Sequence, residues 1–325
     1  MVKFRDAADD ATVLPASVTG RTPVTNDDTA AAAAAPNSSV LDRSIGDILA
    51  ELRHLTVAQV EKVLAYQREK GVRFGEATVA LGLASNDDVI FALAQQFHYP
   101  YAPEEQRKLQ GELVALNEPF SARAESFRAL RSQLMMRLFS GADSQGGNGG
   151  RGGVALAVIS PNTGDGKTYT ATNLAVTLAQ LGGRTLLVDA DMRSPRVHEI
   201  FQLSNQAGLS SILSGRADKQ VIQQVAVIPS LFVLPVGTTP PNPQELVERP
   251  AFGLLLRELV RKFDHVVVDT PAAVHGADAA VIAAKCGAAL VLARKDVSRS
   301  AALRELVASL AGAPVKLAGV VFNEF

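Results

Sequence analysis

The chain has 325 residues, of which 47% are hydrophobic and 20% charged, and its formal net charge at pH 7 is −1. This length allows one sizeable core and a second, smaller one, and the balanced charge excludes a global attraction to nucleic acid or anionic lipid. The single cysteine, Cys286, excludes an internal disulfide framework and a cysteine-built metal site, so we interpret it as a small core residue. No apolar run approaches the roughly 20 residues that a membrane helix requires. We therefore expect a cytoplasmic protein with no direct membrane insertion and no nucleic-acid partner.

The first segment, residues 1–40, is rich in Ala, Thr, Asp, Ser and Pro and lacks amphipathic periodicity, which predicts a disordered tail. Residues 41–103 contain an internal repeat in which Gly46 aligns with Gly75. Apolar residues at helical spacing predict two short helices in each copy, and a capping box precedes the second helix of each. The capping pairs are Thr56 with Gln59 and Ser85 with Asp88. Because such helix pairs cannot bury their apolar stripes alone, we expect the two copies to pack into one small all-α repeat domain.

The remaining chain, residues 104–325, predicts an α/β domain. A glycine-rich stretch at 141–153 predicts a mobile loop, because glycine loses the most backbone entropy on ordering. After this stretch, short β-branched runs alternate with helical segments, which is typical of a mainly parallel sheet flanked by helices. The expected strands are Val154–Ile159, Thr185–Val188, Leu231–Val236, His265–Val268, Ala288–Ala293 and Leu317–Phe322. Ligands of such sheets bind at the carboxyl ends of the strands.

A phosphate-binding loop is predicted directly after the first of these strands. The sequence SPNTGDGKT lies between a predicted strand and a predicted helix, which is the context of a P-loop, although proline stands at the first glycine position of the strict motif. Gly164 and Gly166 let backbone amides turn toward phosphate oxygens, and the helix N-terminus adds its dipole. Lys167 can reach the β and γ phosphates, and Thr168 can ligate magnesium.

Three carboxylates follow other predicted strands. Asp189 and Asp191 leave the second strand on the same side, where either can hold magnesium or accept a hydroxyl proton. Asp269 ends a later strand, at the position expected for a Walker B motif. Taken singly, each carboxylate is equally consistent with capping a helix or a turn. Their joint occurrence at strand ends, together with the P-loop, favours a magnesium-nucleotide site and a P-loop NTPase fold.

Over roughly residues 120–325, these motifs resemble the bacterial tyrosine kinases, or BY-kinases. The matching segments are Gly-Asp-Gly-Lys-Thr at 164–168, Asp-x-Asp-x-Arg at 189–193, Pro-Pro-Asn-Pro at 240–243 with Glu245 and Leu246, Asp-Thr-Pro at 269–271, Asp278, and Gly319–Asn323. The resemblance implies an ATP- and Mg²⁺-dependent tyrosine autokinase that regulates exopolysaccharide or capsule polymerisation and export. It also implies a membrane polysaccharide co-polymerase as a separate partner chain, which would hold the protein at the inner membrane.

The resemblance also implies roles for single residues. The catalytic residues would be Lys167, Asp189 and Asp191, with Asp189 as the base. The nucleotide would be bound by Thr163, Gly164, Asp165, Gly166, Lys167, Thr168, Tyr169 and Asn323, and the metal by Thr168, Asp189 and Asp269. A homo-oligomeric ring would form through Glu125, Arg128 and Arg131, for which the alternative is an ordinary solvated helix face.

The sequence departs from the family in its tyrosines, because none belongs to a C-terminal cluster. The four are Tyr66, Tyr99, Tyr101 and Tyr169. Either the acceptor is on another protein, or the sequence is truncated, or the domain is an ATP-dependent switch. The alternative function is a P-loop switch ATPase of the partition or division-site type without tyrosine kinase activity, although those proteins carry an additional lysine where Asn162 stands.

The N-terminal repeat resembles the N-terminal domain of type II secretion and type IV pilus assembly ATPases, whose paired motifs bind cyclic di-GMP in some members. Arg73, Gly75 and Gly82 of the second copy fit that motif. The first copy has Ser44 in place of the arginine and Arg53 in place of a glycine, although a guanine ligand needs arginine edges and close backbone approach. A cyclic di-GMP sensor and a helical protein-docking module therefore both remain open.

Overall fold

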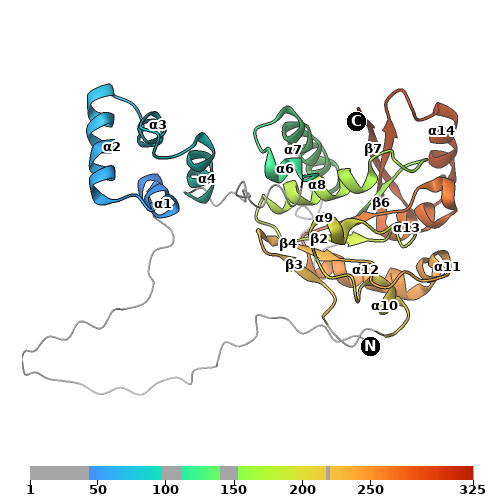
Figure 1. Ribbon diagram of the computed structural model, residues 1–325. Coiled ribbons are helices and arrows are strands. Elements are labelled where there is room, and N and C mark those ends of the chain that lie inside the picture. Colours follow the sequence, from blue (N-terminus) through green and yellow to red (C-terminus); the bar gives the residue numbers. More distant parts are fainter. Residues whose placement is uncertain (1–43, 97–110, 140–152, 217–219, 325) are drawn as a thin grey trace, which may run out of the picture.

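The computed structural model describes residues 44–96, 111–139, 153–216 and 220–324. The expected tail at 1–40 and nearly all of the expected glycine-rich loop at 141–153 lie outside these ranges. The described residues form a small helical unit and an α/β domain (Figure 1).

Four helices make up the described part of the helical unit. They are α1 (Ile45–Leu52), α2 (Val57–Lys70), α3 (Phe74–Ala80) and α4 (Asn86–Gln96). Helix α1 contacts α4, and α2 contacts α3, so each copy of the repeat packs against the other rather than against itself alone. Leu49, Val63 and Ala92 are completely buried between them.

Capping pairs fix the starts of α2 and α4 as the repeat predicts. Thr56 and Gln59 bond reciprocally at α2. At α4, the backbone N–H of Ser85 donates to Asp88 Oδ2 (2.6 Å), and the N–H of Asp88 donates back to Ser85 Oγ (3.1 Å). The same Asp88 oxygen accepts from Arg53 Nε at 2.7 Å. The arginine that stands at the glycine position of the first copy therefore links that copy to the second.

Seven strands of the described chain form one sheet in the order β3-β4-β2-β5-β1-β6-β7 (Figure 1). They are β1 (Ala155–Ile159), β2 (Thr185–Asp189), β3 (Gln223–Val225), β4 (Ile228–Leu234), β5 (His265–Asp269), β6 (Gly287–Arg294) and β7 (Lys316–Asn323). All neighbouring pairs are parallel except β3 with β4. The mainly parallel sheet confirms the sequence prediction. The sequence did not predict β3, because a strand of three residues with one buried side chain is too short to show an alternation of apolar and polar residues.

Helices cover both faces of this sheet. One face carries α6 (Val114–Asn117), α7 (Ala122–Leu134), α8 (Lys167–Ala179) and α9 (Val197–Ile200); the other carries α10 (Leu209–Leu213), α11 (Pro243–Glu248), α12 (Pro250–Lys262), α13 (Asp278–Cys286) and α14 (Ser300–Ser309). In β1, Leu156 and Val158 enter the core beneath α8, whereas Ile159 enters the core beneath α13. Two covered faces explain why the strands read as uninterrupted apolar runs. Cys286 lies in the second core, where burial raises the pKa of its thiol.

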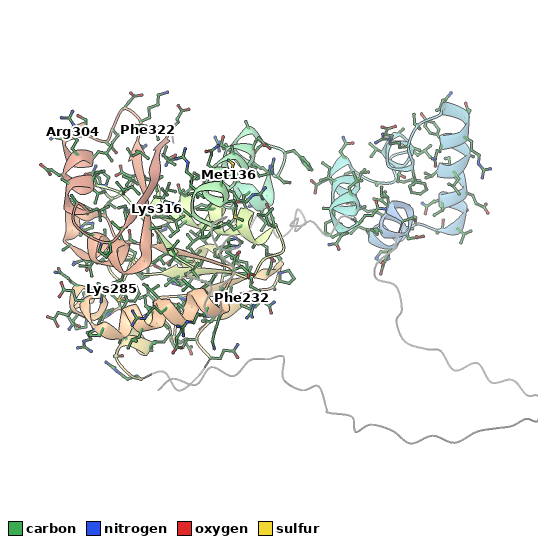
Figure 2. The ribbon with its side chains drawn as sticks, turned by 180° about the vertical axis from the view of Figure 1, so that it is seen from behind. Met136, Phe232, Lys285, Arg304, Lys316 and Phe322 are labelled. Carbon is green, nitrogen blue, oxygen red and sulfur yellow. The ribbon has the colours of Figure 1, made fainter. Side chains whose placement is uncertain are left out.

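The edge strand β7 is tied to the end of α7. A π-helical turn, η1 (Met135–Phe139), continues α7, and Lys316 Nζ donates to the carbonyl of Arg137 at 2.6 Å (Figure 2, where Lys316 is labelled). Arg137 Nη1 in turn donates to the carbonyl of Ala318 at 3.1 Å. These bonds help to place Asn323, the last residue of β7, against the phosphate-binding loop. Within the described ranges, no helix is both long and apolar enough to cross a bilayer.

Candidate phosphate-binding site at the ends of the central strands

The predicted site lies at the carboxyl ends of three adjacent central strands. Strand β1 leads into the P-loop and α8, and β5 lies beside it, followed by β2. The parallel register places Asp189, at the end of β2, directly opposite Asp269, at the end of β5. Sequence positions far apart therefore meet at one edge of the sheet, as the strand-end argument predicts.

The P-loop backbone takes the shape that its glycines allow. Gly164 has φ +83° and Gly166 has φ +97°, a left-handed region that other residues rarely adopt. Gly166 also has the Asn323 side chain packed against its α-carbon, and Asn323 Nδ2 donates to the carbonyl of Asp165 at 3.0 Å. A side chain at position 166 would collide with that amide.

The side chain of Asp165 is buried and forms hydrogen bonds that stabilise the P-loop. Its carboxylate is 1% exposed and accepts from the backbone N–H of Asn162 and from Ser298 Oγ, each at 2.8 Å. Its side chain therefore orders the loop, which leaves only the backbone of Asp165 available to a ligand on the other side. Sequence reasoning did not identify Ser298, because a serine in a loop between β6 and α14 carries no motif.

Lys167 is buried at the base of the loop, with 6% of its surface exposed. Its Nζ donates to Ser160 Oγ (3.0 Å) and to the carbonyl of Asn162 (3.3 Å). Burial lowers the pKa of Lys167, and the nearby charges of Asp269 and Asp191 act in the opposite direction. A desolvated ammonium group with two neutral partners is ready to bind an anion.

Thr168 and Asp269 join the loop to the neighbouring strand. The Thr168 hydroxyl donates to Asp269 Oδ2 at 2.6 Å, and the backbone N–H of Thr270 donates to the other oxygen at 3.1 Å. Asp269 is 1% exposed, and burial raises its pKa to about 7. Two of the three side chains predicted to hold a metal are therefore in direct contact.

The two carboxylates after β2 have different surroundings. Asp189 is completely buried and accepts the N–H of Asp191 (3.1 Å) on one oxygen and that of Val197 (3.2 Å) on the other. Burial, and then the charge of Asp269, raise the pKa of Asp189 well above its usual value. Asp191 is partly exposed, and its Oδ1 accepts the backbone N–H groups of Arg193 (3.1 Å) and Ser194 (3.0 Å).

Comparison with known proteins gives the family. A model of the CobQ/CobB/MinD/ParA nucleotide binding domain matches residues 156–325. The tyrosine-protein kinase YwqD of Bacillus subtilis is 33% identical over 217 residues, which cover 66% of this chain and 87% of YwqD. The chain belongs to the bacterial tyrosine kinase family. Its P-loop and both acidic motifs lie within the part of the chain that matches the nucleotide binding domain.

Other relatives agree with this assignment. The solved kinase domain of the Escherichia coli tyrosine kinase ETK is 30% identical, with a TM-score of 0.58, and the match covers 65% of this chain and 79% of that domain. The tyrosine-protein kinase ptk of Acinetobacter johnsonii is 30% identical over 212 residues, but the match spans 28% of its length. The matched part of the chain therefore corresponds to most of some relatives and to a minor part of others.

A magnesium ion fits the residues of this BY-kinase site. Mg²⁺ in nucleotide sites takes one or two protein carboxylates and completes its shell with phosphate oxygens and water. The Thr168 hydroxyl and the Asp269 carboxylate supply such oxygens, and the Asp189 carboxyl group lies directly opposite Asp269 on the neighbouring strand. Within the described ranges no three acidic, His or Cys side chains are grouped to hold a metal.

A second group of contacts at the mouth of the loop was not anticipated. Thr163 Oγ1 and His275 Nε2 form a hydrogen bond of 2.8 Å, and Arg193 forms an ion pair with Asp278 at 2.9 Å. Thr163 was predicted to touch the nucleotide, but its hydroxyl is engaged by His275. A lone histidine after a strand gives no sequence signal for such a contact.

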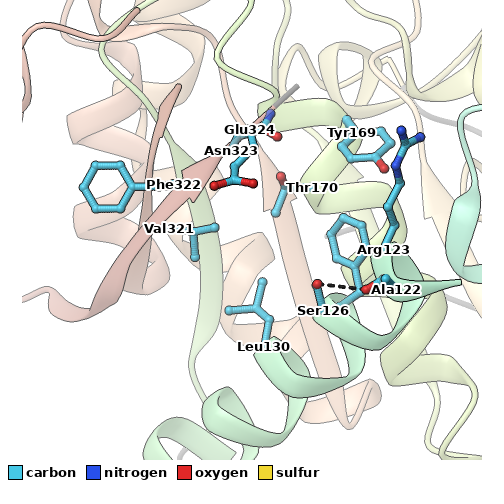
Figure 3. A pocket seen from close by; sticks show the side chains of 11 residues that line it. Ala122, Arg123, Ser126, Leu130, Tyr169, Thr170, Val321, Phe322, Asn323 and Glu324 are labelled. Carbon is cyan, nitrogen blue, oxygen red and sulfur yellow. Dashed lines mark hydrogen bonds between the residues drawn. The ribbon is translucent and has the colours of Figure 1, made fainter. Parts of the chain in front are cut away.

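A cavity of about 440 Å³ adjoins the first turn of α8 (Figure 3). Tyr169 and Arg123 line it on the side of α7 and α8, and Asn323 with Val321 line it from β7. The Tyr169 ring also packs edge-on against Phe127, with centroids 5.6 Å apart. Both predicted nucleotide residues outside the P-loop, Tyr169 and Asn323, therefore meet in one pocket.

Replacing Gly166 with alanine should weaken nucleotide binding strongly. The new methyl group must occupy the space of the Asn323 amide while the backbone stays at φ +97°, so the loop has to open. We expect the affinity for Mg·ADP, measured by calorimetry, to fall at least tenfold, with a loss of stability of about 1–3 kcal/mol. Gly182→Ala, also at positive φ but with open space around it, is the matched control and should lose stability alone.

Proposed function

We propose that the chain is a protein tyrosine kinase that uses Mg·ATP and regulates exopolysaccharide or capsule polymerisation and export. The hydrogen bond between Thr168 and Asp269 carries the proposal, because it brings the P-loop and the second acidic motif into one site. Membership of the BY-kinase family supports tyrosine as the acceptor, since YwqD, ptk and ETK are all named tyrosine kinases.

The binding of the triphosphate follows from the loop geometry. Backbone N–H groups of residues 164–168 and the N-terminus of α8 face the phosphates, and Lys167 leaves Ser160 and Asn162 to bind the γ phosphate. Mg²⁺, when bound with ATP, neutralises charge on the β and γ phosphate oxygens. Thr168 and Asp269 would hold it, and Asp189 would add its negative charge from the adjacent strand.

The acceptor hydroxyl needs a carboxylate that can take its proton. Asp189 was the expected base, but it is completely buried and both of its oxygens accept backbone N–H groups. Asp191 is partly exposed, and its hydrogen bonds to the neighbouring backbone all fall on Oδ1. We therefore assign proton acceptance to Asp191, and to Asp189 the shaping of the loop that carries it.

The nucleoside part of ATP fits the cavity beside α8. The volume of the cavity is in the range of small-molecule sites. Its apolar walls come from the rings of Tyr169 and Phe127 and from Val321, and Asn323 supplies a polar edge. These features support the predicted roles of Tyr169 and Asn323 in nucleotide binding.

We also propose a membrane polysaccharide co-polymerase as a separate partner, which brings the chain to the inner membrane, and a homo-oligomeric ring. The predicted ring residues lie on α7, where Glu125 pairs with Arg128 at 2.7 Å. Arg131 Nη1 donates to the carbonyl of Thr177 on α8 at 2.8 Å. Ring formation through these side chains would therefore exchange contacts within the chain for contacts between chains.

Labelled ATP tests the function. The chain and its Lys167→Met variant are incubated with Mg·[γ-³²P]ATP, with and without the cytosolic segment of a co-polymerase, and the products are separated. Label on tyrosine in the parent but not in the variant supports the proposal, whether on this chain or on the partner. Free phosphate without phosphotyrosine would instead indicate the switch ATPase.

For the helical unit we propose protein docking rather than cyclic di-GMP binding. Gly75 packs so closely on Val89 that any side chain would clash, and Gly82 has φ +69°. The fold of the helical unit therefore accounts for glycine at both positions without a ligand. Calorimetry on the full chain with cyclic di-GMP should show no binding heat at micromolar concentrations. Saturable heat that disappears in Arg73→Ala would establish the sensor instead.

A further inference from the structure

The loop that follows β5 is joined to both halves of the site. At its start, the backbone N–H groups of Ala273 and Val274 donate to the carbonyls of Ser160 and Pro161, each at 3.0 Å. At its end, Asp278 holds Arg193, from the loop that carries the acidic pair. This single segment therefore fixes the P-loop relative to the Asp191 loop.

The ion pair between Arg193 and Asp278 uses only one of the two carboxylate oxygens. Arg193 Nε and Nη2 both donate to Asp278 Oδ2, at 3.2 and 2.9 Å. The Asp278 side chain is 3% exposed, whereas that of Arg193 is 32% exposed. Asp278 Oδ1 is buried and has no hydrogen-bond partner among the residues that the structure describes. Burying a carboxylate this completely costs more free energy than an ion pair with one partly exposed guanidinium gives back. A contribution to stability alone therefore does not account for this ion pair.

Glycine at position 276 leaves the space that this arrangement needs. Its φ is +144°, and a β-carbon there would lie 3.1 Å from Asp278 Oδ2 and 3.6 Å from Arg193 Nη2. The backbone thus passes directly over the ion pair. A side chain there would press on the Asp278 carboxylate and would need a backbone conformation that residues other than glycine rarely adopt.

The guanidinium lies near the mouth of the P-loop, because it packs over Gly276 and the preceding residue, His275, bonds to Thr163 of that loop. The backbone N–H of Arg193 donates to Asp191 Oδ1, and the charge of Asp191 acts on Lys167, the predicted γ-phosphate ligand. Arg193 Nη1 makes no hydrogen bond to any described residue, and the side chain is open to solvent at this edge. The fold therefore leaves a positive charge, held by Asp278, at the same edge of the sheet as the mouth of the P-loop.

We propose that Arg193 is a catalytic residue that binds the phosphoryl group during transfer, and that Asp278 is the positioning residue that holds it there. The inference rests on the proposed kinase function. In the step, the tyrosine oxygen forms a bond to the γ phosphorus while the bond from that phosphorus to the β–γ bridging oxygen breaks. The electron pair of the broken bond stays on ADP, and the tyrosine proton passes to Asp191. Arg193 stabilises negative charge on the γ oxygens, as an arginine supplied in cis does in other phosphoryl transferases.

Four variants separate this role from a purely structural one: Arg193→Ala, Arg193→Lys, Asp278→Ala and the double variant. We expect Arg193→Ala to lower kcat on the order of a hundredfold or more, with the affinity for Mg·ADP changed less than about threefold. Arg193→Lys should recover part of the rate, since the charge remains but the planar fork is lost. Arg196→Ala, which removes a solvent-exposed pair with Glu112, is the control and should keep the parent rate.

The double variant decides between the two roles. If Arg193 serves only to neutralise the buried Asp278 carboxylate, removing Asp278 as well as Arg193 relieves that unpaired charge, and kcat rises toward the parent value. If Arg193 binds the phosphoryl group, the double variant stays as slow as Arg193→Ala, and millimolar guanidine hydrochloride raises the rate of Arg193→Ala. A double variant with parent kcat, or Arg193→Ala with parent kcat, would overturn the proposal.

Failure of the kinase function would look different from failure of this inference. If the parent chain forms no phosphotyrosine, the proposed function fails, and single-turnover ATP hydrolysis becomes the readout for the same variants. Mg·ADP affinity serves throughout as the check that each variant folds.

Discussion

Lys167→Met should lower phosphoryl transfer by at least about a hundredfold, equivalent to about 3 kcal/mol of transition-state stabilisation. The ammonium group lies at the base of the P-loop with two neutral partners, and no other lysine of the described chain lies within that loop. Methionine fills similar volume but cannot follow the γ phosphate as charge develops. Label transfer from [γ-³²P]ATP measures the effect.

The same substitution should not destabilise the protein without nucleotide. Burial lowers the pKa of Lys167, which means that the folded state disfavours its charge, and methionine removes that cost. The midpoint of thermal unfolding is expected to stay within a few degrees of the parent. Lys70→Met, at an exposed ion pair on α2, is the control and should keep full activity. Parent-like turnover by Lys167→Met would contradict the assignment of the site.

Asp269→Asn should have the second large effect, a loss of activity of at least about a hundredfold combined with a gain in stability at alkaline pH. The carboxylate is the partner of Thr168, and an amide is a poor magnesium ligand, so the bound metal loses a charged oxygen. Label transfer at saturating Mg·ATP measures the loss. An active Asp269→Asn variant would show that the metal is held elsewhere.

The pH dependence follows from the raised pKa of Asp269. Its folded-state pKa is about 7, above the usual value of 3.8, so the unfolded chain ionises first as the pH rises. The contribution of this group to stability is therefore complete below about pH 4 and is lost as the pH rises through about 7. The asparagine variant cannot ionise, so its stability relative to the parent should increase from pH 5 to pH 8, on the order of a few kcal/mol.

Urea unfolding at pH 5 and pH 8 tests this sign. Asp296→Asn, at an exposed left-handed position that asparagine adopts readily, is the control and should show no such trend. Saturating Mg·ATP should raise the stability of the parent at pH 8 but not that of Asp269→Asn. A constant difference between parent and variant across this pH range would mean that Asp269 is ionised at all of these pH values.

Local signals in the sequence were sufficient for the fold class and the core of the site. Six apolar runs became strands, and the Gly-Asp-Gly-Lys-Thr segment folded as a P-loop at the end of the first. Both signals act over a few residues, and the direction of a parallel strand fixes which of its ends faces the ligand. The meeting of Asp189 with Asp269 follows from the same rule.

Contacts between loops could not be derived in this way. Asp165 was expected to bind the nucleotide, but its carboxylate is buried beneath the loop and held by Ser298. Asp189 was expected to be the base, but its two oxygens cap the following turns. In each case the sequence shows a carboxylate at the right position, whereas the hydrogen-bond donors around it come from the folded chain.

By itself, the sequence determined that this protein has a mainly parallel sheet with a P-loop and strand-end acids, because periodicity, glycine and strand direction are local properties. Only the tertiary structure decided which side chains remain open to a substrate. Arg193 and Asp278 lie far apart in the sequence, and their pairing over Gly276 depends on how two loops pack at the edge of the sheet. Such packing depends on burial and on the donors that neighbouring elements supply, which no single segment encodes.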